Sequence, residues 1–335
     1  MKTAFVGVTL IAVIMLTDGC SKTAPPLGAN KGVKPSVIIV KPLEHPSLEQ
    51  CINGFKQGLS DSGFDSEKID IELLNANGNF ANVAGLVKAA VAKNPNVIFT
   101  VTTQAASDAI KITDGKVPLV YSAVTDPVQA GIVSAWERSS TWATGVSDRY
   151  PVEEQVAVFT SLKPNAKTFA LLYNPAEQNS QILVEETYKA ILAGGLTPKK
   201  YAVNKADDIS ATLKAALAEN DCAIVNGDNL LTENLHTVIK ICIAARKPLF
   251  VGDPDSVRKG AVATVGPSYF EIGRLAGQKA AEIIKGKSPG SIPSERPRSF
   301  DYIINMEAAA AMNVEVPPTF WRKMTVWESR AAAAK

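Results

Sequence analysis

The feature that most constrains the fold is a pattern that the chain contains twice. Residues 40–47 read V-K-P-L-E-H-P-S, and residues 173–180 read Y-N-P-A-E-Q-N-S. The proline, the glutamate and the serine of the two stretches match at one offset of 133 residues. Each stretch follows a short apolar run and precedes a segment with helical spacing of apolar residues. The pattern predicts two structural units, each with a strand that leads into a helix.

The repeat continues beyond the first strand of each unit. Residues 117–120 read V-P-L-V and residues 247–250 read K-P-L-F, and each run is followed by the motif D-x-V-x-x-G, at 126–131 and at 255–260. Two unrelated parallel α/β units could share such turn residues, because proline, aspartate and glycine favour turns generally. The matched spacing favours two copies of one fold.

Strand-like and helix-like segments alternate through both halves. Predicted strands cover 37–40, 70–74, 96–101 and 117–122, then 168–173, 198–203, 223–226 and 248–252. Predicted helices begin near 47 and cover 83–91 and 103–114, then 180–193, 208–218 and 232–245. Strands with continuous apolar runs that alternate with helices are typical of parallel sheets covered on both faces. We therefore predict an α/β protein with two doubly wound lobes.

The first 34 residues have the features of an export segment. Lys2 precedes an apolar run at 4–16, which is too short to span a bilayer as a helix, and Gly19 precedes Cys20. This resembles the lipobox of bacterial lipoproteins, although Thr17 stands where an aliphatic residue is usual. We expect a signal peptide at 1–20 with Cys20 lipidated, and a flexible tether at 21–34. The alternative is a signal peptide that is removed without lipidation.

Composition and motifs exclude several function classes. The net charge is +2 and the basic residues are scattered, so nucleic acid is not an expected partner. Only two histidines occur, and no Walker loop, G-x-G-x-x-G or nucleophile elbow is present, so we expect neither a metal, nor a cofactor, nor catalysis. A bridge between Cys222 and Cys242 is possible in an exported protein, but the sequence does not decide it.

Candidate ligand-binding residues follow the predicted strands, because ligands of open parallel sheets bind beyond the carboxyl ends of strands. They are Glu44, His45, Thr102, Thr103, Gln104, Ser122, Thr125 and Asp126 in the first half, and Tyr173, Asn174, Glu177, Asn179, Ser180, Asp228, Asn229, Asp253 and Asp255 in the second.

The chemistry of these candidates suggests a ligand with two charged poles. The helix start at Thr102 and Thr103 suits a carboxylate, and the acids at Asp228, Asp253 and Asp255 suit an ammonium. The alternatives are helix caps for the threonines and solvated turns for the acids.

Seven stretches together resemble a known family. They read E-H-P-S-L at 44–48, S-A-V-T-D-P-V at 122–128, T-G-V-S-D at 144–148, P-V-E-E-Q at 151–155, L-L-Y-N-P-A-E-Q-N-S at 171–180, D-P-D-S-V at 253–257 and G-P-S-Y-F-E-I-G-R at 266–274. In these, the chain resembles the ABC-transporter substrate-binding proteins of the group that includes tryptophan- and tyrosine-binding lipoproteins. The resemblance covers about residues 35–313.

The resemblance implies a type I periplasmic-binding-protein fold. Its two lobes would be 35–146 with 267–289 and 147–266 with 299–316, joined by a three-segment hinge near 145–150, 264–267 and 289–299. The tail 317–335 lies outside the resemblance and has no expected role. The implied function is capture of an amino-acid-like, often aromatic ligand for a membrane permease, by an exported, lipid-anchored monomer. A sensory receptor and an exported enzyme on the same fold are the alternatives.

Overall fold

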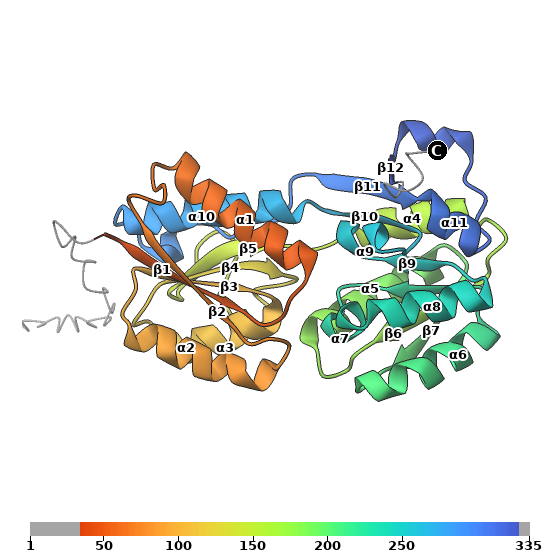
Figure 1. The fold of residues 1–335 in the computed structure, drawn as a ribbon, viewed down its shortest axis with the longest axis horizontal. Coiled ribbons are helices and arrows are strands. Elements are labelled where there is room, and N and C mark those ends of the chain that lie inside the picture. The colour runs from red at the N-terminus through yellow and green to blue at the C-terminus, as the bar shows by residue number, and fades with distance from the viewer. Residues whose placement is uncertain (1–33, 328–335) are drawn as a thin grey trace, which may run out of the picture.

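Two α/β lobes stand side by side in the computed structural model, which describes residues 34–327 (Figure 1). Lobe 1 is built on a five-stranded sheet and lobe 2 on a seven-stranded sheet. The predicted fold class is confirmed. Among residues 34–327, no helix combines the length and the apolar character needed to cross a membrane.

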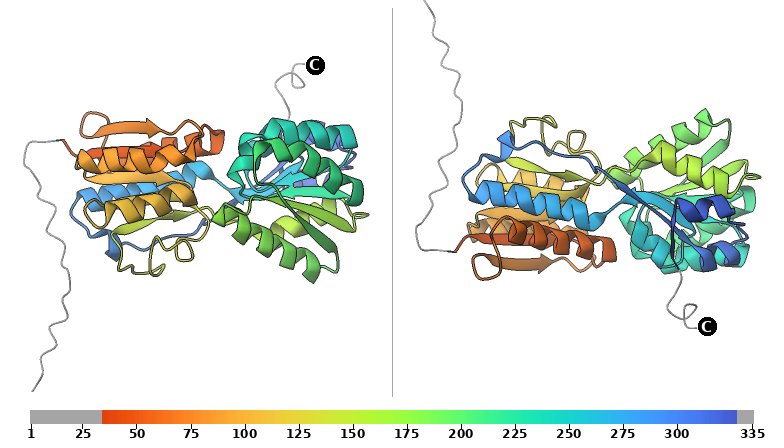
Figure 2. Two further views of the ribbon diagram at one scale, coloured as in Figure 1. Left: turned by 90° about the horizontal axis from the view of Figure 1, so that it is seen from below. Right: turned by 90° about the horizontal axis from the view of Figure 1, so that it is seen from above.

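The sheet of lobe 1 is parallel throughout and has the order β2-β1-β3-β4-β5. Its strands are β1 (Ser36–Lys41), β2 (Asp70–Asn75), β3 (Val97–Val101), β4 (Leu119–Val124) and β5 (Ala143–Ser147). Its helices are α1 (Pro46–Asp61), α2 (Val83–Ala92), α3 (Thr103–Thr113) and α10 (Tyr269–Ile284), with 3-10 turns at Phe80–Asn82 and Pro289–Ser291. Helices α1 and α10 cover one face, and α2 and α3 cover the other (Figure 2).

The sheet of lobe 2 has the order β12-β11-β10-β9-β8-β6-β7. Its strands are β6 (Thr168–Tyr173), β7 (Thr197–Ala202), β8 (Cys222–Val225), β9 (Leu249–Val251), β10 (Ala263–Pro267), β11 (Phe300–Asn305) and β12 (Thr325–Trp327). Its helices are α4 (Val152–Leu162), α5 (Gln178–Ala193), α6 (Ile209–Glu219), α7 (Asn229–Glu233), α8 (Leu235–Ala245), α9 (Pro254–Arg258) and α11 (Met306–Ala311), with 3-10 turns at Ala206–Asp208 and Pro318–Arg322.

The repeat seen in the sequence is the repeat of one sheet order. Numbered within each lobe, the first five strands of both lobes lie in the order 2-1-3-4-5 and run parallel. The two matched stretches are the β1–α1 loop and the β6–α5 loop. Both loops therefore lie at the carboxyl ends of strands, where ligands of such sheets bind.

Helices α1 and α10 cross with their backbones in contact. A Cβ atom on Gly273 would lie 1.9 Å from the carbonyl oxygen of Cys51, and one on Gly277 would lie 2.1 Å from that of Phe55. Gly54 and Gly58 of α1 meet the backbone of α10 equally closely. Only glycine permits this approach. Beneath the crossing, the rings of Phe55 and Phe99 stack with their centroids 3.8 Å apart.

Three segments cross between the lobes. The first joins β5 to α4, the second joins β10 to α10, and the third leads from the turn at Pro289–Ser291 to β11. The third crossing is bonded to the first, because Ser147 N donates to the carbonyl oxygen of Glu295 at 2.8 Å and Glu295 N donates to that of Gly145 at 3.0 Å. That these three segments act as a hinge stays a prediction.

Some elements differ from the sequence prediction. The expected helix 232–245 is two helices, α7 and α8, which meet at Asn234. Strand β11 runs antiparallel to β10, so the sheet of lobe 2 is not wholly parallel. The three cysteines in the described range are free and buried, so Cys222 and Cys242 form no bridge.

The segment after residue 316 is part of lobe 2. Strand β12 pairs in parallel with β11, and Trp327 lies over the guanidinium of Arg258 at 5.9 Å. Part of the expected tail 317–335 is thus the edge of the larger sheet. The expected boundary of lobe 2 at residue 316 falls before this edge strand.

Candidate functional site

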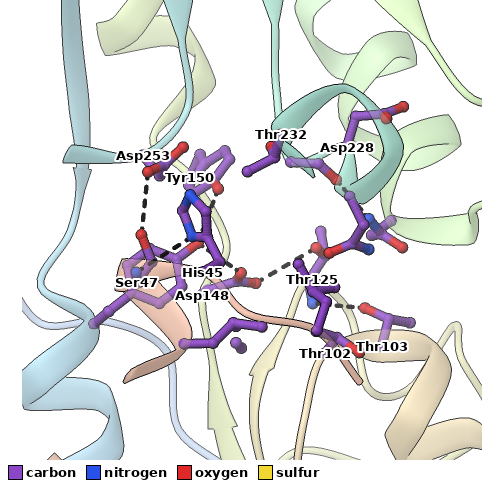
Figure 3. A pocket seen from close by; sticks show the side chains of 17 residues that line it. His45, Ser47, Thr102, Thr103, Thr125, Asp148, Tyr150, Asp228, Thr232 and Asp253 are labelled. Carbon is purple, nitrogen blue, oxygen red and sulfur yellow. Dashed lines mark hydrogen bonds between the residues drawn. The ribbon is translucent and has the colours of Figure 1, made fainter. Parts of the chain in front are cut away.

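A cavity lies between the lobes at the carboxyl ends of both sets of strands (Figure 3). Its volume is about 50 Å³. The residues that line it are Leu43, His45, Ser47, Leu48, Thr102, Thr103, Ala123, Thr125, Asp148, Tyr150, Asn179, Gly227, Asp228, Asn229, Thr232, Asp253 and Tyr269. The structure thus brings together loops that are far apart in the sequence.

About half of the candidate residues line this cavity. They are His45, Thr102, Thr103, Thr125, Asn179, Asp228, Asn229 and Asp253. The other candidates do not line it: Glu44, Gln104, Ser122, Asp126, Tyr173, Asn174, Glu177, Ser180 and Asp255. Most of the second group have partners within the protein.

In lobe 1 three of these candidates bond away from the cavity. Glu44 accepts from the ammonium of Lys41 at 2.8 Å, and Gln104 donates to Asp108 at 3.1 Å. Asp126 accepts from Arg149 at 2.7 Å. The polar groups of these side chains serve local packing and turn structure.

In lobe 2 a loop is held in shape by Asp228, which lines the cavity, and by several candidates that do not line it. Both carboxylate oxygens of Asp228 are bonded: one accepts from Leu231 N at 2.8 Å, and the other from Asn174 N at 2.5 Å and from Ser180 Oγ at 2.6 Å. Glu177 accepts from Leu230 N at 3.0 Å. Burial raises the pKa of Asp228 to about 6, with a smaller contribution from the charge of Glu177. Asp228 therefore acts first as a scaffold for its own lobe.

The two repeated serines have different partners. Ser180 bonds within lobe 2, as described, whereas Ser47 at the start of α1 reaches across the cleft (Figure 3). Its Oγ lies 2.8 Å from Asp255 Oδ2 and 3.1 Å from Asp253 Oδ1, both in lobe 2. A hydroxyl has one proton, so it donates to one of the two carboxylates at a time. Ser47 is a direct bond between the lobes in this arrangement.

Removing this bond should favour the open arrangement of the lobes. We expect Ser47→Ala to increase the radius of gyration of the unliganded protein in small-angle scattering, because one interlobe hydrogen bond contributes about 1 kcal/mol. Ser180→Ala is the matched control, since its bond lies within lobe 2 and its loss should lower stability without opening the cleft. Equal radii for the Ser47 variant and the unaltered chain would contradict the prediction.

His45 presents an unused donor at the cavity. Its Nδ1 accepts from Ser47 N at 3.2 Å, and burial lowers its pKa, so the neutral ring carries its proton on Nε2. The ring is only 6% exposed, and Nε2 has no hydrogen-bond partner within the described range. A buried N–H without an acceptor is costly, so this atom suits an acceptor supplied from outside the chain.

Backbone strain gathers at the same place. Thr102 has φ of +82°, and Ala123 has φ of +55°, although neither is glycine. Thr102 directly follows β3, and Ala123 lies at the end of β4. Both residues line the cavity. Such conformations cost roughly 1–3 kcal/mol each and gather at functional sites.

Sequence reasoning missed the contribution of the crossings between the lobes. Asp148 lies on the first crossing and accepts from the hydroxyl of Tyr269 at 3.1 Å and from that of Thr125 at 3.4 Å. The hydroxyls of Tyr150 and Tyr269 are 2.9 Å apart, which ties the first crossing to the second. Burial raises the pKa of Asp148 to about 6. The stretch T-G-V-S-D contained Asp148, but was read only as part of a hinge.

The charges that line the cavity are all of one sign. Asp148, Asp228 and Asp253 line it, and none of the three is in an ion pair within residues 34–327. No lysine or arginine lines it in that range. Across residues 34–327 there is no group of three or more histidine, cysteine or acidic side chains placed to hold a metal ion. The cavity favours a ligand with a positive group.

Solved structures with the same fold include one protein with a bound ligand and one without. An ABC domain in complex with L-Trp from Streptococcus pneumonia is 26% identical, with a TM-score of 0.84 over 88% of this chain and 99% of the other. The ligand-free, open structure of a substrate-binding protein with adhesive properties from Clostridium difficile is 27% identical, with a TM-score of 0.69 over 89% and 100%. At similar identity, the TM-score with the L-Trp complex is the higher of the two.

Sequence comparisons agree with the fold. A tyrosine-binding protein of Clostridioides difficile (strain R20291) is 28% identical over 313 residues, which cover 91% of this chain and 90% of that protein. The family model described as ABC transporter substrate binding protein matches residues 36–323. The chain therefore belongs to the family of ABC transporter substrate-binding proteins.

Proposed function

We propose that this protein captures an amino acid with an aromatic side chain in the cavity between the lobes and delivers it to an ABC importer. The observation that carries the proposal is a cavity lined by both lobes. Within residues 34–327 it combines His45, whose Nε2–H has no acceptor, with carboxylates that have no ion-pair partner. An amino acid has a carboxylate for the first and an ammonium for the second. L-Trp is bound by one structural relative, and another relative is named as tyrosine-binding.

The size of the cavity requires the lobes to open before a ligand enters. A cavity of about 150 Å³ holds a benzene molecule, whereas this one measures about 50 Å³. An indole or phenol side chain therefore needs a wider cleft than the present one. Closure around a bound ligand would then link occupancy to the shape that a permease recognises.

Native mass spectrometry followed by calorimetry tests the proposal. We expect the purified protein to carry an amino acid of matching mass, and the ligand-free protein to bind L-tryptophan or L-tyrosine but not glucose. Binding of the sugar alone, or a co-purified ligand without an amine and a carboxylate, would refute the proposed ligand class. A ligand with those groups but no aromatic ring would refute only the aromatic preference.

We also propose that the protein acts outside the cytoplasm and is anchored by a lipid on Cys20, which lies outside the described residues. We expect Cys20→Ser to move the protein from the membrane fraction to the soluble fraction of the producing cells, because the acyl chains supply the anchor. Ser21→Ala is the control, since it keeps the cysteine. An unchanged distribution of the Cys20 variant would show that the cysteine is not used.

A further inference from the structure

We infer that Asp148, on the first crossing between the lobes, holds the ammonium of the ligand, so that the hinge itself carries the amine subsite. This inference rests on the proposed function. It departs from the expectation that acids of lobe 2 alone would hold the amine. Asp148 lies at the edge of the cavity between Tyr150 and Thr125 (Figure 3).

The first argument is the unused capacity of the three cavity carboxylates. Asp228 accepts three bonds from its own lobe at 2.5–2.8 Å. Asp253 accepts from Ser256 N at 2.8 Å and from Ser256 Oγ at 2.5 Å, besides its bond to Ser47. Asp148 accepts from two hydroxyls, at 3.1 and 3.4 Å, and from its own backbone N–H. The bonds that Asp148 accepts from other residues are therefore fewer and on the whole longer than those of Asp228 and Asp253, and a carboxylate with about four acceptor positions keeps room for a further donor.

The second argument is the cost of a partly buried carboxylate that has no ion-pair partner within residues 34–327. Thr125, Tyr150 and Tyr269 face Asp148 from lobe 1 and from the first two crossings, and none of them supplies a positive charge. The negative charge of Asp253 also acts on Asp148 and raises its pKa further. The neighbouring Arg149 instead bonds Asp126 and Glu186. An ammonium would therefore supply the charge that this site lacks.

The third argument is the position of the second pole. His45 lines the same cavity, and its Nε2–H has no acceptor among the described residues, which suits the carboxylate of the same ligand. The start of α3 at Thr102 adds the positive end of a helix. A ligand held at these two places would contact lobe 1 and the hinge before any contact with lobe 2.

This arrangement gives the hinge a direct part in closure. Tyr269 OH bonds both Asp148 and Tyr150 OH, and so ties together two crossings that must turn relative to one another when the lobes open. An ammonium at Asp148 would change the charge balance at that junction. Binding of the amine and the angle between the lobes are then coupled at one carboxylate.

Calorimetry with paired ligands tests the inference. L-Tryptophan and indole-3-propionate differ only in the amine, so the ratio of their affinities measures the amine subsite. We expect the unaltered protein to prefer tryptophan by about 30-fold or more, which corresponds to about 2 kcal/mol. Asp148→Asn should reduce this ratio to near one. Asp253→Asn, an isosteric change at another cavity carboxylate, should weaken both ligands and keep most of the ratio.

A second measurement begins with the unaltered protein, so its first result does not depend on how well a variant folds. In the unaltered protein the ratio should fall as the pH drops through about 6, because protonation of Asp148 removes the charge that attracts the amine. Asp228 titrates in the same range, so the ratio in Asp228→Asn should still fall, whereas that in Asp148→Asn should stay flat.

The outcomes separate the inference from the proposed function. If the unaltered protein binds tryptophan selectively and Asp148→Asn keeps the ratio while Asp253→Asn or Asp228→Asn loses it, the hinge subsite is overturned and the function stands. If the unaltered protein binds neither tryptophan nor tyrosine, and native mass spectrometry finds a ligand without an amine, both fall.

Discussion

Gly273→Ala is expected to lower the free energy of unfolding by about 3 kcal/mol. The added methyl group would lie 1.9 Å from the carbonyl oxygen of Cys51, and the next nearest atoms are also backbone. No side chain can rotate away, so α1 and α10 must separate, and close-packed interiors resist such shifts. Helix α10 covers the core of lobe 1 that contains Phe55 and Phe99, so the separation exposes that core. Urea unfolding followed by circular dichroism measures the loss.

The control for this prediction is Gly85→Ala. Gly85 lies in α2, and a Cβ atom there would meet nothing within 4 Å. Alanine at this position should stabilise the protein by roughly 0.5–1 kcal/mol, because glycine is the poorer helix former. A Gly273 variant that unfolds at the same urea concentration as the unaltered chain would show that the two helices are not held at this distance in solution.

Asp148→Asn is expected to make the unliganded protein more stable at pH 7.5. The pKa of Asp148 rises from 3.8 to about 6 on folding, because the partly buried carboxyl loses solvation. Above pH 6 the folded protein must keep a charge that it disfavours, at a cost of about 1.4 kcal/mol per unit of pKa. Asparagine avoids this cost but bonds Thr125 and Tyr269 less well, so we expect a net gain of about 2 kcal/mol.

The dependence on pH identifies the cause. Below about pH 4 the carboxyl is protonated in the folded and the unfolded states, so the advantage of asparagine should disappear there. It should grow as the pH rises from about 4 to 6 and remain constant above. Asp228→Asn is the contrasting variant: it has a similarly raised pKa, but loses bonds to Asn174 N, Ser180 Oγ or Leu231 N and should be destabilised. A gain from Asp148→Asn that does not vary with pH would rule out this explanation.

Much of the fold could be predicted because its signals are local and repeated. The run at 168–173 is apolar and bounded by polar residues, and strand β6 covers the same residues. The rule that ligands bind beyond strand ends selected Thr102, Asp228 and Asp253 as candidates, and all three line one cavity in the structure. These placements follow from parallel topology, which gathers the carboxyl ends of strands at one edge.

The rest depends on relations that no local pattern contains. Glu44 and Glu177 occupy matched positions, yet Glu44 bonds Lys41 at the surface and Glu177 organises a loop in lobe 2. Asp148 reaches the cavity only because three separate crossings meet beside it. Strand β12 is three residues long, too short for a periodic signal, and its place is set by its pairing with β11.

The second and third crossings return the chain to lobe 1 and then to lobe 2, and this order affects how the protein folds during synthesis. Lobe 1 lacks α10 until residue 284 has been added, and lobe 2 lacks β11 and β12 until residues 305 and 327 have been added. A ribosome has therefore translated most of the message before either lobe has its last layer. Domains generally fold as units during synthesis, the first one early, but here the first lobe waits for the second. We expect the growing chain to stay incompletely folded until these last elements are added, because neither lobe can cover its core earlier.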